Sequence, residues 1–174
     1  MKNLTILLVG TVLLGCAPHL ANSAKMAIAD LHNPQGQHVG IATLTEGHDG
    51  VRIAVNLYNM PPGTHAFHIH AAGSCESPDF KSAKGHFNPF GRKHGLKSAD
   101  GPHAGDLLNI TIAADGTGAA IVTAPMATLG KGDNSLFREG GTAIMIHDGP
   151  DDYVSDPAGN AGPRIACGLI REAK

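Results

Sequence analysis

Histidine is the residue type whose number and spacing point most directly to chemistry in this chain. Seven of the eleven histidines fall between His65 and His147. His68 and His70 are two positions apart, and because alternate side chains of a β-strand share a face, both imidazoles could bind one ion. His147 ends a predicted strand that could return beside them in a barrel. A single pair of this kind is often only a solvated strand face, so a metal site needs further ligands.

A second set of possible ligands follows in a long stretch over 73–105. It contains His86, His94 and His103, and Asp106 comes three residues later as the next strand begins. Three imidazoles and one carboxylate form a closed tetrahedral set, which is typical of a structural zinc ion. Because this stretch offers few apolar side chains to a core, metal binding would also explain how it becomes ordered. The alternative is that these histidines are surface residues.

The elements that must position these side chains are short β-strands, since apolar residues recur at short intervals without a helical period. The clearest alternation of apolar and polar residues covers 51–58, and a second covers 108–112. Each alternation gives a strand one face for the core. The predicted strands are 25–32, 38–46, 51–58, 64–71, 107–113, 119–124, 142–148 and 165–171.

Turn-forming residues at 33–36, 49–50 and 115–116 connect neighbouring strands. They predict three hairpins, which pair 25–32 with 38–46, 38–46 with 51–58, and 107–113 with 119–124. We therefore predict an all-β fold, an antiparallel barrel or sandwich of about eight strands with two long functional loops. The loops are 73–105 and 149–164, and loops of this length in a small domain are usually functional or disordered.

Composition narrows the class of protein. The 174 residues are 42% hydrophobic and 16% charged, which indicates one globular domain. Thirteen Lys and Arg against fifteen Asp and Glu give a net charge of −2. Since there is no basic excess for a phosphate backbone, nucleic-acid binding is excluded.

The N-terminus is typical of an export signal. The apolar stretch 4–15 has the length of a signal-peptide core and is too short to span a bilayer. It ends at Cys16 in the sequence Leu-Leu-Gly-Cys, which resembles a bacterial lipobox, whereas cleavage after Ala24 is the alternative. We predict a signal peptide and linker over 1–24, a mature domain over 25–174, and a periplasmic or cell-envelope protein attached to the membrane through lipidated Cys16.

The cysteine count agrees with this prediction. The chain has three cysteines, so lipidation of Cys16 leaves Cys75 and Cys167 as an even pair. Two cysteines can form a disulfide in an oxidising compartment. The alternative is two free buried thiols.

Several motifs together resemble one enzyme family, copper/zinc superoxide dismutase, from about Met26 to Glu172. They occur in family order along more than a hundred residues, so no single motif carries the resemblance. The motifs are GTHAFHIH at 63–70, GHFNP at 85–89, the series His94, His103 and Asp106, and GNAGPRIACG at 159–168. The resemblance implies an eight-stranded antiparallel Greek-key β-barrel.

The resemblance also implies a role for each matching residue. The implied copper ligands are His68, His70, His86 and His147, and the implied zinc ligands are His86, His94, His103 and Asp106. Asp151 matches the carboxylate that links a copper-ligand histidine to a zinc-ligand histidine, although it could instead only cap a turn. Arg164 matches the arginine beside the copper, and Cys75 and Cys167 match the family disulfide.

The implied reaction is the dismutation of superoxide to oxygen and hydrogen peroxide. It needs an ion that changes charge by one electron, which copper does and zinc does not. His86 would carry a proton to the departing peroxide, and Arg164 would attract the anion. The alternative for Arg164 is an exposed ion pair with Asp156. Five further cations of the first long loop are candidates for guiding the anion: Lys81, Lys84, Arg92, Lys93 and Lys97. The alternative is that they only form a solvated face of the loop.

Two other functions are compatible with parts of the pattern. A mononuclear cupin-like site using Glu76 would leave the ligands from His86 onward unexplained. A metal-binding module without activity would use the same fold, but here no ligand is missing. His65 is offset by three from His68, so we predict a structural residue bonded to the backbone. We expect turn and surface roles for His19, His32, His38 and His48, and the oligomeric state, monomer or homodimer, stays open.

Overall fold

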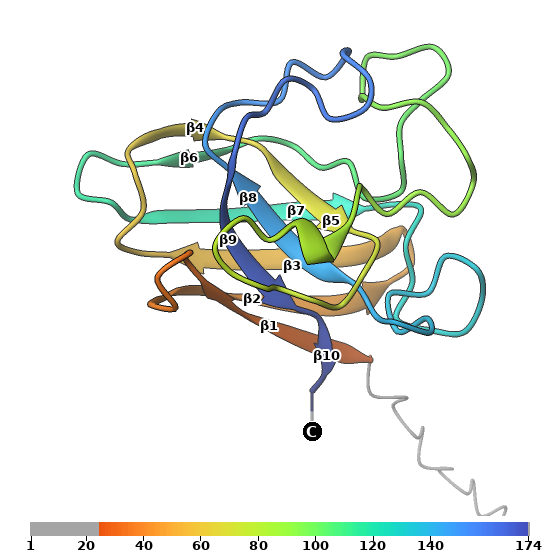
Figure 1. Cartoon of the computed structure of the whole chain (residues 1–174). Helices are drawn as coiled ribbons and strands as arrows, with labels where there is room; N and C mark the ends of the chain where they lie inside the picture. Colours follow the sequence, from red (N-terminus) through yellow and green to blue (C-terminus); the bar gives the residue numbers. More distant parts are fainter. Residues whose placement is uncertain (1–24, 174) are drawn as a thin grey trace, which may run out of the picture.

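Ten short strands and one 3-10 turn form the regular structure of the computed structural model, which describes residues 25–173 (Figure 1). The strands are β1 (Met26–His32), β2 (His38–Gly47), β3 (Gly50–Leu57), β4 (Gly63–His65), β5 (Phe67–His70), β6 (Ile110–Ile112), β7 (Gly118–Ala124), β8 (Ala143–His147), β9 (Arg164–Leu169) and β10 (Arg171–Glu172). The 3-10 turn η1 covers Lys81–Ala83. No helix within 25–173 is long and apolar enough to cross a membrane.

The strands form a curled antiparallel sheet in the order β5-β8-β9-β1-β2-β3-β7, with β10 paired to β1. A separate two-strand sheet pairs β4 with β6. The predicted all-β, antiparallel class is therefore confirmed. The count rises from eight to ten because the predicted strands 64–71 and 165–171 are each divided in two.

The division of 64–71 occurs at Ala66, where the chain leaves one sheet for the other. Its N–H donates to the carbonyl of Gly149 at 2.8 Å, and its carbonyl accepts from the N–H of His147 at 3.0 Å. The backbone of Ala66 is thus bonded to the end of β8 and the loop after it, while β4 pairs with β6 and β5 with β8.

Two of the three predicted hairpins are confirmed as paired strands, β1 with β2 and β2 with β3. The third prediction is half right. A tight turn joins β6 to β7, with Ala113 N donating to Thr117 O at 2.8 Å. Beyond the turn the two strands separate, since β6 pairs with β4 and β7 pairs with β3. A turn motif therefore located the connection but did not determine the partner of each strand.

The main core lies inside the curled sheet. Along β3, Val51, Ile53, Val55 and Leu57 are buried and alternate with more exposed residues, as predicted. Full burial of each such side chain contributes about 1.5–3 kcal/mol to the stability of the fold.

Strands β5 and β8 differ from β3, because they are buried on both faces. Their inner residues join the main core, whereas Met145 on the outer face of β8 packs in a second cluster with Phe80 of the first long loop. The loops therefore cover the outer face of β5 and β8.

A disulfide fixes this cover to the sheet. Cys75 in the first long loop is bonded to Cys167 on β9, 92 positions later, which confirms the predicted pair. A closure of this length stabilises the fold by about 4–5 kcal/mol on the chain-entropy model. The second long loop, between β8 and β9, is joined to the first, since Lys97 N donates to Tyr153 O at 3.0 Å. In Figure 1 the part of the first loop that carries η1 lies in front of the sheet, and the second loop lies at the top of the view.

Candidate metal centre

Strand β5 turns two histidines away from the core. Because Phe67 and Ile69 pack into the main core, the alternation of the strand directs His68 and His70 to the opposite face. The adjacent strand β8 ends at His147, whose Nε2 lies 3.5 Å from Nε2 of His70. The predicted convergence of these three imidazoles is thus present, and all three are buried.

The first long loop brings further side chains to the same face by bonding to β5. The N–H and the carbonyl of Ile69 both bond to loop backbone, at 2.9 and 2.8 Å. Isolated bridges then pair His70 with His86 and His68 with Asp106. Backbone pairing, rather than side-chain packing, therefore sets the position of the loop residues.

Two groups of possible ligand atoms result. Within each group, one nitrogen or oxygen of every residue lies within 4.8 Å of those of the others. The first group is His68, His70, His86 and His147, and the second is His86, His94, His103 and Asp106. These are the two sets expected from the sequence, and His86 belongs to both.

Backbone carbonyls orient two of the imidazoles. His70 Nδ1 donates to Lys84 O at 2.8 Å, and His147 Nδ1 donates to Gly162 O at 3.0 Å. Each ring therefore keeps Nε2 free to face the group.

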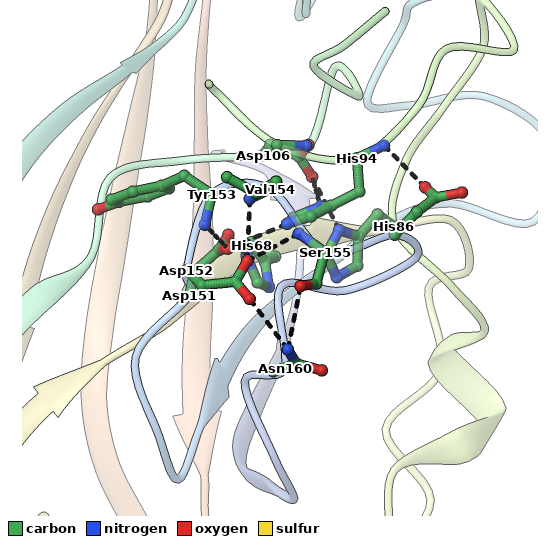
Figure 2. Close-up of polar contacts among 12 residues, drawn as sticks. His68, His86, His94, Asp106, Asp151, Asp152, Tyr153, Val154, Ser155 and Asn160 are labelled. Atoms are coloured by element: carbon green, nitrogen blue, oxygen red, sulfur yellow. Dashed lines mark hydrogen bonds and ion pairs between the residues drawn. The ribbon is translucent and has the colours of Figure 1, made fainter. Parts of the chain in front are cut away.

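Asp151 orients two more rings (Figure 2). His68 Nε2 donates to one carboxylate oxygen at 2.8 Å and His94 Nε2 donates to the other at 3.0 Å. Asp151 also accepts from the N–H of Tyr153. Asp151 therefore contacts one ring of each group and also caps a turn.

Asp106 is the meeting point of the second group. One of its carboxylate oxygens lies 2.8 Å from Nδ1 of His86, 3.1 Å from Nδ1 of His94 and 3.2 Å from Nδ1 of His103. The other oxygen accepts the backbone N–H groups of Gly95 and His103 at 2.8 and 3.0 Å. These bonds fix the carboxylate among the three rings.

Three buried ring nitrogens have no hydrogen-bond partner within residues 25–173. They are His68 Nδ1, His86 Nε2 and His94 Nδ1. Buried polar groups are normally paired, so three such atoms in one cluster need an explanation. Metal ions would satisfy them, since imidazole nitrogens suit copper and three imidazoles with one carboxylate suit zinc.

Burial keeps the first group neutral, which is the form that binds metal. Burial lowers the pKa of His68 to about 3, against the opposing hydrogen bond with Asp151. It lowers the pKa of His147 to about 4, and it also lowers the pKa values of His70 and His86.

His94 differs from the other buried rings. Burial alone would lower its pKa, but the adjacent carboxylate of Asp106 and the hydrogen bond to Asp151 outweigh burial and raise the pKa to about 9. Both carboxyl groups have pKa values well below the usual range, because their bonds to histidines outweigh their own burial. The second group therefore has one carboxylate within it, Asp106, and a second beside it, Asp151, and both favour positive charge at its centre.

Arg164 lies at the start of β9, half-buried against the first long loop. Its two terminal nitrogens donate to the carbonyls of Phe80 and Lys84, each at 2.6 Å. The alternative of an exposed pair with Asp156 is wrong, because Asp156 instead accepts from Lys93 and from the backbone of His94.

The histidines expected to be structural or superficial lie outside both groups. His65 is buried, and its ring nitrogens contact the carbonyls of Pro61 and His147, each at 2.8 Å, which confirms the expected backbone bonding. His38 and His48 lie on the surface, as expected, where His38 contacts Tyr58 and His48 contacts Asp49. His19 lies outside the described residues.

Sequence reasoning missed the carbonyls of Phe80, Lys84 and Gly162, which hold Arg164, His70 and His147. Every residue has a carbonyl, so residue types carry no signal for this role. Phe80 and Lys84 have positive φ angles of 53° and 63°, which is an unusual backbone geometry for residues other than glycine. Their residue types give no indication of this geometry in the sequence.

Comparisons with known proteins agree with this geometry. The family model for copper/zinc superoxide dismutase matches residues 38–170. Superoxide dismutase [Cu-Zn] 2 of Aquifex aeolicus is 53% identical over 173 residues, covering 98% of this chain and 100% of that protein. Superoxide dismutase [Cu-Zn] 1 of the same organism is 56% identical over 145 residues, covering 82% and 86%.

A solved structure shows the same architecture. The crystal structure of a superoxide dismutase-like protein from Bacillus subtilis has a TM-score of 0.80 and 40% identity, covering 83% of this chain and 97% of that chain. The curled sheet is thus the Greek-key β-barrel of this family, as the resemblance of the motifs implied. The chain therefore belongs to the copper/zinc superoxide dismutase family, and it dismutates superoxide with copper and zinc as cofactors.

Proposed function

We propose that His68, His70, His86 and His147 hold the copper and that His86, His94, His103 and Asp106 hold the zinc. The observation that carries this assignment is the orientation of the rings. His68, His70 and His147 each use one nitrogen for a protein hydrogen bond and leave the other facing the group. When bound, copper supplies a one-electron redox couple and zinc supplies a fixed positive charge.

His86 has the geometry for a proton relay. Its Nδ1 faces Asp106 at 2.8 Å, while its buried Nε2 has no hydrogen-bond partner among residues 25–173. We assign Nε2 to the copper side, where it takes up a proton and gives it to the departing peroxide. Two superoxide ions and two protons give one oxygen and one hydrogen peroxide, so each cycle delivers two protons to product.

Arg164 docks the anion in this proposal. Two of its five N–H donors are used by loop carbonyls, which fixes the plane of the guanidinium, and the others remain for substrate. Asp151 is a positioning residue, because it touches His68 and His94 rather than the reacting atoms.

We also propose that the enzyme is exported and protects the cell envelope from superoxide. The support is the signal-like stretch 4–15 and Cys16, which lie outside the described residues, together with the disulfide, which suits an oxidising compartment. The domain begins at residue 25 in this proposal, and the protein is a monomer or homodimer. Replacing Cys16 with Ser should abolish membrane fractionation and the acyl mass on the N-terminus, and a soluble wild-type form starting at Lys25 would contradict the anchor.

The ligand assignment is tested by metal analysis of two variants. His86→Ala should lose activity and disturb both metals, whereas His147→Ala should mainly weaken copper binding. Full occupancy by both metals and normal activity in His86→Ala would show that this residue is not shared.

A further inference from the structure

Two exposed histidines face each other at the end of the hairpin formed by β1 and β2. His32 is the last residue of β1 and His38 is the first of β2, and the two are register partners. Their ring centroids are 5.2 Å apart. The rings of His68 and His147, in the first metal group, are also 5.2 Å apart. The two surface imidazoles are therefore close enough to share one ion.

A β-bulge produces this pairing. Leu31 pairs with Gly40 and His32 pairs with His38, so Val39 is an extra residue on β2. Val39 is fully buried, whereas His38 is exposed. Without the extra residue, His32 would face Val39, and the second imidazole would be lost from this position. Bulges re-aim side chains in this way and are often found next to functional sites.

The turn between the two histidines is held by its own hydrogen bonds. The side-chain oxygen of Asn33 accepts the N–H groups of Gln35 and Gln37 at 3.1 and 3.0 Å. The side-chain nitrogen of Asn33 donates to the Gln37 side chain at 2.8 Å. The two strand ends are thus fixed relative to each other, and such preorganisation lowers the entropy cost of binding.

A carboxylate and a phenol lie beside the two rings. Asp30 precedes His32 by two residues on the same face of β1, and its Oδ1 lies 3.6 Å from Nε2 of His38. Nδ1 of His38 contacts the hydroxyl of Tyr58. Donation from Nδ1 to that hydroxyl leaves Nε2 as the nitrogen that faces Asp30, as backbone carbonyls do for rings of the first metal group.

The carboxylate of Asp30 is available to a cation. Asp30 and His32 line a surface hollow of about 320 Å³, which leaves room for the water ligands of an open site. Arg171 also lines this hollow, but within 25–173 no ion pair joins Asp30 to a lysine or arginine. The ligand atoms of Asp30, His32 and His38 are not all within 4.8 Å of one another, so the exposed His32 ring must turn to close the site.

We propose that His32, His38 and Asp30 bind one divalent transition-metal ion at a site separate from the two metal groups. Imidazole nitrogens suit Cu²⁺, Ni²⁺ and Zn²⁺, and Cu²⁺ binds most tightly in this series. Strand β2 lies four positions along the sheet from β5, about 19 Å at the usual strand spacing. The ion is therefore bound on the outside of the barrel and takes no part in the dismutation of superoxide.

The experiment is a calorimetric titration of Cu²⁺ into the protein already loaded with copper and zinc. Wild type should bind one further Cu²⁺. The electron paramagnetic resonance signal of this ion, after subtraction of the resident copper, should show coupling to two imidazole nitrogens.

Replacement of the ligands should change both readouts. His32→Gln and His38→Gln should each weaken the further binding at least about ten-fold and reduce the coupling to one nitrogen. Loss of a group that only orients a ligand already costs about 10–100-fold, so loss of a ligand should not cost less. Asp30→Asn should also weaken the binding but keep the coupling to two nitrogens.

The matched control is His48→Gln. His48 is another exposed histidine beside a carboxylate, with Nδ1 at 2.9 Å from Oδ1 of Asp49, but within 25–173 it has no imidazole partner. This variant should bind the further Cu²⁺ as tightly as wild type. All four variants should keep wild-type activity and resident metal content, since none of these side chains belongs to the two metal groups.

The proposal is overturned if the loaded wild type binds no further Cu²⁺. It is also overturned if the double variant of His32→Gln and His38→Gln binds the further ion as tightly as wild type, because the ion would then lie elsewhere. Equal weakening in His48→Gln would overturn it too, since binding would then come from scattered surface histidines. Metal content of the His86 and His147 variants does not enter this test, so this site and the ligand assignment can fail separately.

Discussion

Asp151→Asn is the substitution that most directly tests how the metal centre is held. The carboxylate accepts from His68 at 2.8 Å and from His94 at 3.0 Å, and all three side chains are fully buried. Asparagine has nearly the same shape but only one acceptor oxygen. One of the two imidazole N–H groups must therefore face an amide NH₂, which is also a donor.

The expected loss follows from these contacts. Leaving one buried donor unpaired costs about 1–3 kcal/mol. Loss of a residue that orients metal ligands typically weakens metal binding about 10–100-fold, which corresponds to about 1.4–2.8 kcal/mol and agrees with that range. Because His94 is one of the two rings, we expect zinc affinity to fall by this factor.

The assay is a zinc competition between the metal-free protein and a chromophoric chelator near neutral pH. The control is Asp152→Asn, which removes the same charge from the neighbouring residue. Asp152 is exposed, and it accepts hydrogen bonds from Val154, Ser155 and Asn160 of its own loop (Figure 2). Its substitution should leave zinc affinity within about two-fold of wild type.

The reasoning would be refuted if Asp151→Asn bound zinc as tightly as wild type. Equal losses in the two variants would also refute it, because the effect would then come from net charge or loop stability rather than from the bond to His94.

Three further predictions concern stability, pH and substrate docking. Replacing both disulfide cysteines with serine should lower the free energy of unfolding in urea by about 4–5 kcal/mol, and a loss under 1 kcal/mol would contradict the loop-closure argument. The metal-free protein should be most stable at about pH 6.5. Below this pH, stability falls because protons bind the histidines of the unfolded chain but not buried His68, whose pKa is about 3. Above it, the stabilising contribution of protonated His94 is lost as the pH rises to about 9, the pKa of this residue in the folded protein. Urea unfolding at several pH values measures this, and equal stability at pH 4 and 6.5 would count against it. Arg164→Glu should cut the superoxide rate strongly at unchanged copper content, and full activity in a copper-replete variant would leave Arg164 a structural role.

The sequence allowed the two groups of possible metal ligands to be predicted, because the signals for them lie in short stretches of sequence. The two-residue period of a strand places His68 and His70 on one face, and the ligand types of the loop resemble a known family. The partner of β6 could not be predicted, because a turn motif specifies only where the chain reverses. The carbonyl of Lys84 could not be found either, since its role depends on backbone angles and on two residues distant in sequence.

The double burial of β5 and β8 gives this domain two interiors of different chemical character. The inner one is hydrocarbon, whereas the outer one combines the small apolar cluster of Met145 and Phe80 with buried imidazoles and carboxylates, and we expect it to reach its full cohesion only with cations inside it. Amide hydrogen exchange on the metal-free protein should therefore be fast in the two loops and slow in β1 to β3, and loading with zinc should slow the loops selectively. We therefore expect metal supply to set how many cooperative units the native state contains.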